Sequence, residues 1–390
     1  MVLSIAATSD AAALTEITDF GANPGNLGMF LYVPENVQPH PAVLVGLHWC
    51  HGTAEAYFNG NQFHTYADEY GYIMICPETH TSDQCFDVHS TETLTHDGGG
   101  ASQSVASMVK WVIANKNADA TRVFVAGHSG GGMMTNVMAG SYPEVFAAAS
   151  ASAGVPFGCF AGGDYTWNDD CAKGKVTRTA EEWKELVLAA YPGYTGPRPR
   201  MQLWHGANDD VLYPANFDEE VKQWTGVLGV SQPPSTTETN TPFSDYTRTR
   251  YKDASGTVLV EAVKGLNQPH NIKISDEEVI RFFDLDKTVG ISPRQAGVCN
   301  QLSETVSIRK CASGRYNLAV NTHPGLISAA LYDCRGRRMA IIGEHNSGSG
   351  NTEFNFTLSD ADHHHPVAPA VYMVCVKVNG SVIYAQPLTF

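Results

Sequence analysis

The chain has 390 residues, a length that suggests two domains or one large domain with an appendage. A hydrophobic content of 43% with 17% charged residues is typical of a folded protein with a substantial core. The formal net charge of −15 argues against a nucleic-acid partner, because there is no basic surface to displace the counterions of phosphates. No run approaches the roughly 20 apolar residues that a membrane-spanning helix needs, so we expect no membrane partner.

Predicted strands and helices alternate from residue 42 to about residue 285. The strand candidates 42–47 and 72–76 are continuous apolar runs, as expected for strands buried on both faces of a mostly parallel sheet. Residues 247–251 and 258–263 are typical of a hairpin. The alternation predicts the α/β class with a doubly wound sheet. The remaining candidates are strands at 122–126, 146–154 and 200–204 and helices at 62–70, 102–114, 133–139, 217–227 and 275–283.

The composition changes at residues 287–297, which carry Gly290, Pro293 and Gly297. Beyond this stretch no helical period is present, and short β-rich segments follow one another. This pattern predicts a small antiparallel β-sandwich. We therefore place the domain boundary near residue 292, with domains 1–292 and 293–390. The β-rich segments are 305–308, 316–320, 327–332, 339–342, 353–358, 371–378 and 382–384.

One strand–turn–helix stretch carries a serine at its turn. The β-formers Val123, Phe124 and Val125 run into Gly127-His-Ser-Gly-Gly131, and a helix-compatible segment follows. The nucleophile elbow of α/β-hydrolases has this arrangement, with the serine exposed on a strained turn. Glycines two residues before and after the serine let strand and helix pack closely. G-x-S-x-G alone is a weak signal in a chain with 36 glycines, so Ser129 needs a base and an acid from elsewhere.

A serine hydroxyl needs an imidazole to take its proton and a carboxylate to orient that imidazole. In α/β-hydrolases the acid and then the histidine follow the serine, each in a loop after a strand. Asp209 follows the strand candidate 200–204, and His270 follows 258–263. Asp210 is the alternative acid. His128 is expected to pack away from the serine across the turn.

An oxyanion hole needs backbone N–H groups that already point at the developing charge. Gly130 provides one, as the residue after the nucleophile. The loop 48–53 provides the second, for which we select Cys50, with Trp49 and His51 as alternatives. We interpret Cys50 as bound in a disulfide to Cys85 rather than as a catalytic thiol.

The nine cysteines are scattered and form no C-x-x-C pair, which fits disulfides in a secreted protein. Their odd number predicts one free thiol, and Cys76 in the apolar run 72–76 is our choice for it. The N-terminus has neither the basic region nor the apolar run of a signal peptide. The sequence is therefore either cytoplasmic or a mature secreted form with an added methionine, and the cysteines favour the second.

With these residues in view, the chain resembles carbohydrate esterase family one, the acetyl xylan and feruloyl esterases, which is related to the secreted polyhydroxybutyrate depolymerases. The resemblance covers about residues 42–285. It implies a Ser129–Asp209–His270 triad and an oxyanion hole from the backbone of Cys50 and Gly130. The segments that carry it are 47–57, 85–88, 94–100, 127–136, 190–196, 201–206, 221–225 and 246–251.

The tail from about residue 293 lies outside this resemblance. Its segments 330–338 and 371–380 look like the small C-terminal β-domains of some secreted bacterial enzymes. We expect disulfides Cys299–Cys311 and Cys334–Cys375 there, and a structural, sorting or carbohydrate-binding role.

These observations predict a secreted serine carboxylic-ester hydrolase that needs no metal or cofactor and acts on esterified xylan of the plant cell wall. Acetyl release is the first expectation, feruloyl release the second and polyhydroxybutyrate depolymerisation the third. Trp49 and Trp167 are the expected substrate-binding aromatics, because planar rings suit sugars and cinnamoyl groups, whereas Trp204 is expected in the core. The alternative from another class is a non-catalytic carbohydrate-binding protein.

Overall fold

The structure is a computed structural model that describes residues 13–162, 167–230 and 232–287, together with seven strands between residues 305 and 389. The chain divides into two compact units, Met1–Lys287 and Thr288–Phe390. Among the described residues, no helix is both long and apolar enough to cross a membrane.

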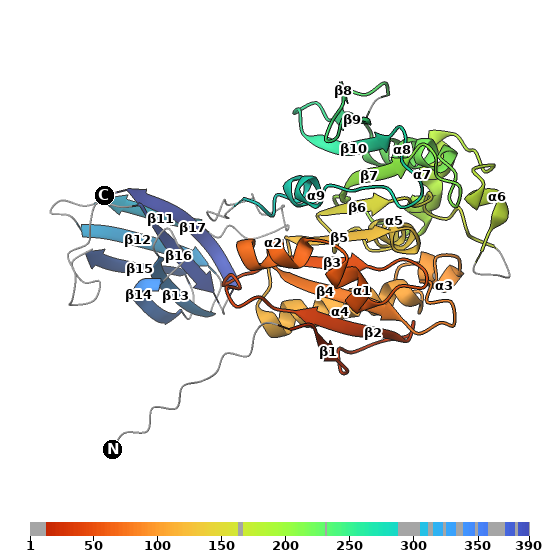
Figure 1. Cartoon of the computed structure of the whole chain (residues 1–390). Coiled ribbons are helices and arrows are strands. Elements are labelled where there is room, and N and C mark those ends of the chain that lie inside the picture. Colours follow the sequence, from red (N-terminus) through yellow and green to blue (C-terminus); the bar gives the residue numbers. More distant parts are fainter. Residues whose placement is uncertain are drawn as a thin grey trace, which may run out of the picture. The chain divides into compact units, whose positions relative to one another are not determined.

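The first unit is built on a ten-stranded mixed sheet in the order β1-β2-β4-β3-β5-β6-β7-β10-β9-β8 (Figure 1). The six strands from β4 to β10 in this order are parallel to one another, and two strands in antiparallel pairing complete each edge. This confirms the predicted α/β class. The strands are β1 (Thr15–Ile17), β2 (Leu27–Tyr32), β3 (Val43–Leu47), β4 (Ile73–Thr79), β5 (Val123–His128), β6 (Ala148–Ser152), β7 (Arg200–Gly206), β8 (Thr236–Thr239), β9 (Tyr246–Lys252) and β10 (Val258–Gly265).

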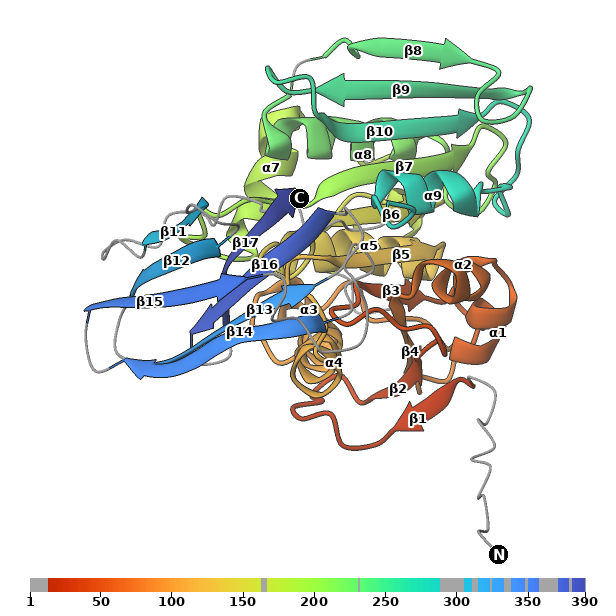
Figure 2. The same cartoon turned by 90° about the vertical axis from the view of Figure 1, so that its left-hand side faces the viewer.

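Helices cover both faces of this sheet, so its central strands are buried on both sides (Figure 2). Val43 and Val45 belong to the core cluster on one face, which includes residues of α4, α5, α7 and α8, whereas Leu44 belongs to the cluster on the other face, with residues of α1, α2 and α9. The helices are α1 (Ala54–Asn59), α2 (Phe63–Tyr70), α3 (Thr91–Leu94), α4 (Ala101–Lys116), α5 (Gly130–Ser141), α6 (Asp169–Ala172), α7 (Ala180–Ala189), α8 (Ala215–Leu228) and α9 (Asp276–Phe282).

The expected helices and strands of this unit are present, with ends shifted by a few residues. Helix α7 was not predicted, although it begins with a full capping box in which Thr179 and Glu182 exchange hydrogen bonds. The strand order was not predicted either. In the sheet, β4 lies between β2 and β3. This position depends on pairing between strands that are far apart in the chain.

The second unit contains two antiparallel sheets, ordered β11-β12-β15 and β14-β13-β16-β17. All seven predicted β-rich segments are strands. Cys299, Cys311 and Cys334 lie outside the described residues, and so do both disulfides expected in this unit. The strands are β11 (Thr305–Lys310), β12 (Arg315–Thr322), β13 (Gly325–Tyr332), β14 (Arg338–Ser347), β15 (Gly350–Thr357), β16 (Val371–Val378) and β17 (Ser381–Thr389).

Candidate active site

Ser129 stands at the sharp turn between β5 and α5. Its backbone has φ 56° and ψ −119°, a conformation that residues other than glycine rarely adopt and that marks a strained turn. Small flanking residues are required here. A Cβ on Gly131 would lie 2.0 Å from the carbonyl oxygen of Leu47, and one on Gly127 would lie 2.3 Å from the carbonyl oxygen of Gly131. The predicted strand–turn–helix around Ser129 is therefore present, with the expected close packing.

His270 bridges Ser129 and Asp209. Its Nε2 lies 2.8 Å from the Ser129 hydroxyl oxygen, and its Nδ1 lies 2.8 Å from Oδ2 of Asp209. The three residues follow β5, β7 and β10, which run in the same direction and so end at the same edge of the sheet. The side chain of Asp209 is fully buried, and that of His270 is 15% exposed. The arrangement can move a proton from the serine to an imidazole held by a carboxylate.

Asp209 is held as a carboxylate by several donors. The N–H groups of Val211 and Leu212 each donate to Oδ1 at 2.9 Å. Burial alone would raise the pKa of Asp209, but the hydrogen bonds from His205 and His270 outweigh it and hold that pKa well below its ordinary value. The adjacent Asp210, the alternative acid from the sequence, is exposed to solvent.

His205 is a neighbour of the acid that the sequence reasoning missed. Its Nε2 lies 3.2 Å from Oδ2 of Asp209 and 2.8 Å from the carbonyl oxygen of Leu212, and its side chain is fully buried. The available signal was its position four residues before Asp209, at the end of β7. A histidine and an aspartate that bracket a tight loop after a strand are brought together by that loop.

The ring of His128 lies beside that of His270, with the ring centroids 5.5 Å apart. Its Nδ1 is 3.3 Å from the hydroxyl oxygen of Ser152. Burial, together with the nearby His270, lowers the pKa of His128 to about 4. His128 is therefore neutral near pH 7, and it packs against the candidate base.

The two oxyanion donors expected from the sequence, Cys50 and Gly130, lie together next to Ser129. A Cβ on Gly130 would lie 3.3 Å from the backbone nitrogen of Cys50, so these two residues are immediate neighbours. Neither N–H group donates a hydrogen bond within the described part of the chain. The N–H group of His51, an alternative donor, is occupied by the carbonyl oxygen of Asp83 at 3.0 Å.

Two expectations for the cysteines of the first unit are confirmed, the Cys50–Cys85 disulfide and the free Cys76, whereas the pairing of Cys159 with Cys171 was not predicted. Cys50 and Cys85 form a disulfide, which ties the loop after β3 to the segment 81–88. Cys159 and Cys171 form a second one. Cys76 is a free, fully buried thiol whose pKa burial raises to about 12, so it is chemically inert.

The two tryptophans predicted to contact substrate differ in environment. Trp49 is half-buried in the loop after β3 and packs against the core on the α1 side. Trp167 is 46% exposed, its ring meets Phe160 edge-on at 5.6 Å, and its Nε1 donates to Asp169 at 3.0 Å. Trp204 is buried in the core, as expected.

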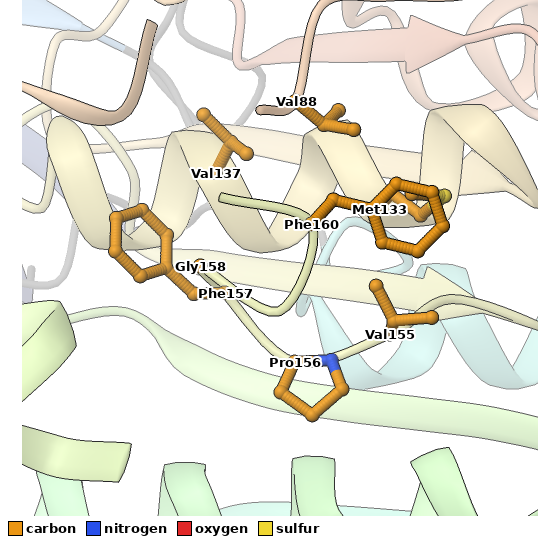
Figure 3. Close-up of a pocket in the computed structure, with 8 residues that line it drawn as sticks. All are labelled: Val88, Met133, Val137, Val155, Pro156, Phe157, Gly158 and Phe160. Atoms are coloured by element: carbon orange, nitrogen blue, oxygen red, sulfur yellow. The ribbon is translucent and has the colours of Figure 1, made fainter. Parts of the chain in front are cut away.

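A small apolar pocket lies beside α5, one to two turns beyond Ser129 (Figure 3). Met133 and Val137 line it from the helix, and Val155 and Phe160 line it from the segment after β6; all four are buried. None of Ser129, Asp209 and His270 lines it. We assign this pocket to core packing and not to substrate binding. Within the described ranges, no group of three or more His, Cys, Asp or Glu side chains is placed to hold a metal ion.

Comparisons with known proteins place the chain in a family. Residues 27–233 match the family described as esterase PHB depolymerase. Acetylxylan esterase A of Emericella nidulans is 46% identical over 274 residues, which are 69% of this chain and 88% of that protein. Probable acetylxylan esterase A of Aspergillus fumigatus is 47% identical over 275 residues, covering 70% of this chain and 73% of the relative.

A solved structure, acetyl xylan esterase from Aspergillus awamori, superposes with a TM-score of 0.67 at 43% identity and covers 70% of this chain and 99% of its own. That structure and the mixed sheet with its flanking helices agree on the α/β-hydrolase fold. The chain belongs to the esterase PHB depolymerase family and, with these relatives, to carbohydrate esterase family one, and is a carboxylic ester hydrolase.

Proposed function

We propose that the protein removes acetyl groups from xylan, a cell-wall polysaccharide, through an acyl-enzyme formed on Ser129. The observation that carries the proposal is the position of His270, 2.8 Å from both the Ser129 hydroxyl and the Asp209 carboxylate. The substrate is inferred from relatives named acetylxylan esterase, which share close to half of the aligned residues.

In the first half of the reaction, Oγ of Ser129 attacks the ester carbonyl while Nε2 of His270 takes its proton. Asp209 fixes the tautomer of His270 and stabilises the imidazolium that forms. The tetrahedral intermediate collapses with cleavage of the bond to the sugar oxygen, and His270 donates its proton to that oxygen, which leaves as a hydroxyl. In the second half, His270 activates a water molecule, which releases acetate from Ser129.

The negative charge of the tetrahedral intermediate falls on the former carbonyl oxygen. We assign the backbone N–H groups of Cys50 and Gly130 as its donors, because they are adjacent and donate to nothing else in the described residues. The Cys50–Cys85 disulfide restrains the first of them. Donors fixed in advance cost no reorganisation during the reaction.

Trp49 and Trp167 are assigned to substrate binding in this proposal. Trp49 flanks the oxyanion donor Cys50, and the exposed ring of Trp167 offers a flat apolar face of the kind on which sugar rings stack. In this proposal both tryptophans contact the sugar unit that carries the acetyl group.

We further propose that the enzyme acts outside the cell and that its two parts are an esterase domain, 1–292, and a C-terminal β-sandwich, 293–390. Two disulfides in the first unit suit an oxidising compartment. The two antiparallel sheets of the second unit suit a sandwich with a structural, sorting or carbohydrate-binding role.

The test is acetate release from acetylated xylan by the natural protein and by Ser129→Ala. We expect kcat to fall by about 10⁴-fold or more, because the nucleophile is lost. Ser107→Ala on α4 is the matched control and should leave the rate unchanged. Activity that survives in Ser129→Ala would refute Ser129 as the nucleophile. Release of ferulate from methyl ferulate, with none of acetate, would refute the acetyl assignment.

A further inference from the structure

A second hollow lies in the first unit, between the N-terminal ends of α2 and α9. It has a volume of about 480 Å³, which is within the usual range of roughly 300–1,000 Å³ for ligand sites. A hydrogen bond of 2.8 Å from the backbone N–H of Gln62 to Asp276 joins its two sides. We call it the α2–α9 groove; its walls are residues 59–62 and Tyr66 on one side and Phe243 with residues 273–277 on the other.

The groove offers both flat apolar faces and hydrogen-bonding groups. The rings of Tyr66 and Phe243 are half-buried along it. The amide side chains of Asn59 and Gln62 are exposed and make no hydrogen bond within the described residues. The ammonium group of Lys273 lies 4.3 Å from the centre of the Phe243 ring. Sugar rings present apolar faces and hydroxyl edges, so this combination of groups is complementary to them.

Other ligand classes fit the groove less well. Asp276 and Glu277 line it beside Lys273, so an anionic ligand would meet more negative than positive charge. The side-chain amides of Asn59 and Gln62 would lose water without gaining a partner against a purely apolar ligand, which is costly. A neutral chain with many hydroxyl groups can stack on the aromatic rings and form hydrogen bonds with the polar groups.

The groove borders the candidate active site through two segments. Gly60 lines it, and a Cβ on Gly60 would lie 3.6 Å from the indole of Trp49, which adjoins the oxyanion donor Cys50. On the other wall, Lys273 is three residues beyond His270 in the same loop. A chain bound in the groove would therefore lead toward Ser129.

We propose that the α2–α9 groove binds the main chain of the neutral polysaccharide whose ester is cleaved at Ser129. The inference rests on the proposed function and adds a subsite to it. Binding energy from sugar units in the groove holds the reacting ester in place beside the serine. A small ester does not extend into the groove, so its hydrolysis gains no binding energy there.

The test compares kcat/KM for acetylated xylan with kcat/KM for 4-nitrophenyl acetate in Phe243→Ala and Lys273→Gln. We expect the ratio of the two values to fall about tenfold in Phe243→Ala, through lost stacking, and about threefold in Lys273→Gln, through a lost donor. Lys273 is exposed, so its replacement tests the groove even if Phe243→Ala folds poorly. The matched control is Lys116→Gln, whose ammonium also lies over an aromatic ring, Trp111 at 5.9 Å, on α4. Its ratio should equal that of the natural protein.

A second readout uses binding without turnover. Xylohexaose is titrated by calorimetry into Ser129→Ala and into the double variant Ser129→Ala with Phe243→Ala, and we expect about tenfold weaker binding in the double variant. If the natural protein fails to cleave acetylated xylan, the proposed function fails, and this titration still decides the groove. Equal affinity in both proteins, or unchanged ratios in both groove variants, would overturn the groove proposal.

Discussion

The two units of the molecule differ in the kind of contact on which they depend. In the first unit, the hydrogen bond from Ser129 to His270 joins residues 141 positions apart, and the one that His270 donates to Asp209 spans 61 positions. In the second unit, the described contacts are the ladders of two antiparallel sheets, which include hairpin pairs such as β16 with β17 and pairs of more distant strands such as β13 with β16. The chemistry that we propose therefore resides in the first unit, where sequence-distant loops converge.

The largest effect is expected when the carboxylate of the proposed triad is replaced by an amide. Asp209→Asn keeps the shape of the acid but presents the wrong partner to Nδ1 of His270, so we expect kcat for 4-nitrophenyl acetate to fall about 10⁴-fold. Asp210→Asn is the matched control, since Asp210 is exposed next to it. A similar loss in both variants would contradict the assignment of Asp209 as the acid.

A buried carboxyl group of the first unit makes its stability depend on pH. Burial raises the pKa of Glu220 to about 7 from an ordinary 4.5, and Nδ2 of Asn136 donates to Oε1 of Glu220 at 2.6 Å. A pKa that is raised on folding gives stability that is complete below pH 4.5 and is lost as the pH rises through about 7.

Glu220→Gln removes the titration and retains an oxygen for Asn136. We therefore expect the variant to be more stable than the natural protein at pH 8, by on the order of 2 kcal/mol, with little difference at pH 4. Urea unfolding at the two pH values measures this. Glu185→Gln, an exposed carboxyl on α7, should change stability at neither pH. The same gain at both pH values would show that ionisation of Glu220 is not the cause.

The smallest effect is expected from removing the second unit. Residues 1–287 alone should hydrolyse 4-nitrophenyl acetate with kcat/KM within about twofold of the full chain, because a compact unit with its own core retains its site. Circular dichroism of the shortened protein checks that it is folded. A folded but inactive product would show that the second unit completes the site, and the contrast between the units would be wrong.

Local patterns in the sequence were sufficient for most of the strands and longer helices and for the residues of the proposed triad. Continuous apolar runs identified β3 and β4, short β-rich segments identified the seven strands of the second unit, and the glycines around Ser129 identified the turn. Asp209 and His270 were found from their order along the chain after two strands. Cys76 was identified as the free thiol because it lies in an apolar run. Each of these patterns lies within a short segment or in the order of segments along the chain. Within a segment, the spacing of apolar residues reflects which faces are buried.

Tertiary structure alone determined the strand order. It also formed the α2–α9 groove, whose walls come from residues 59–62, 66, 243 and 273–277. None of these features has a pattern within one short segment. They arise when buried faces of distant segments pack together, and the resulting distances depend on the pairing and register of the whole sheet.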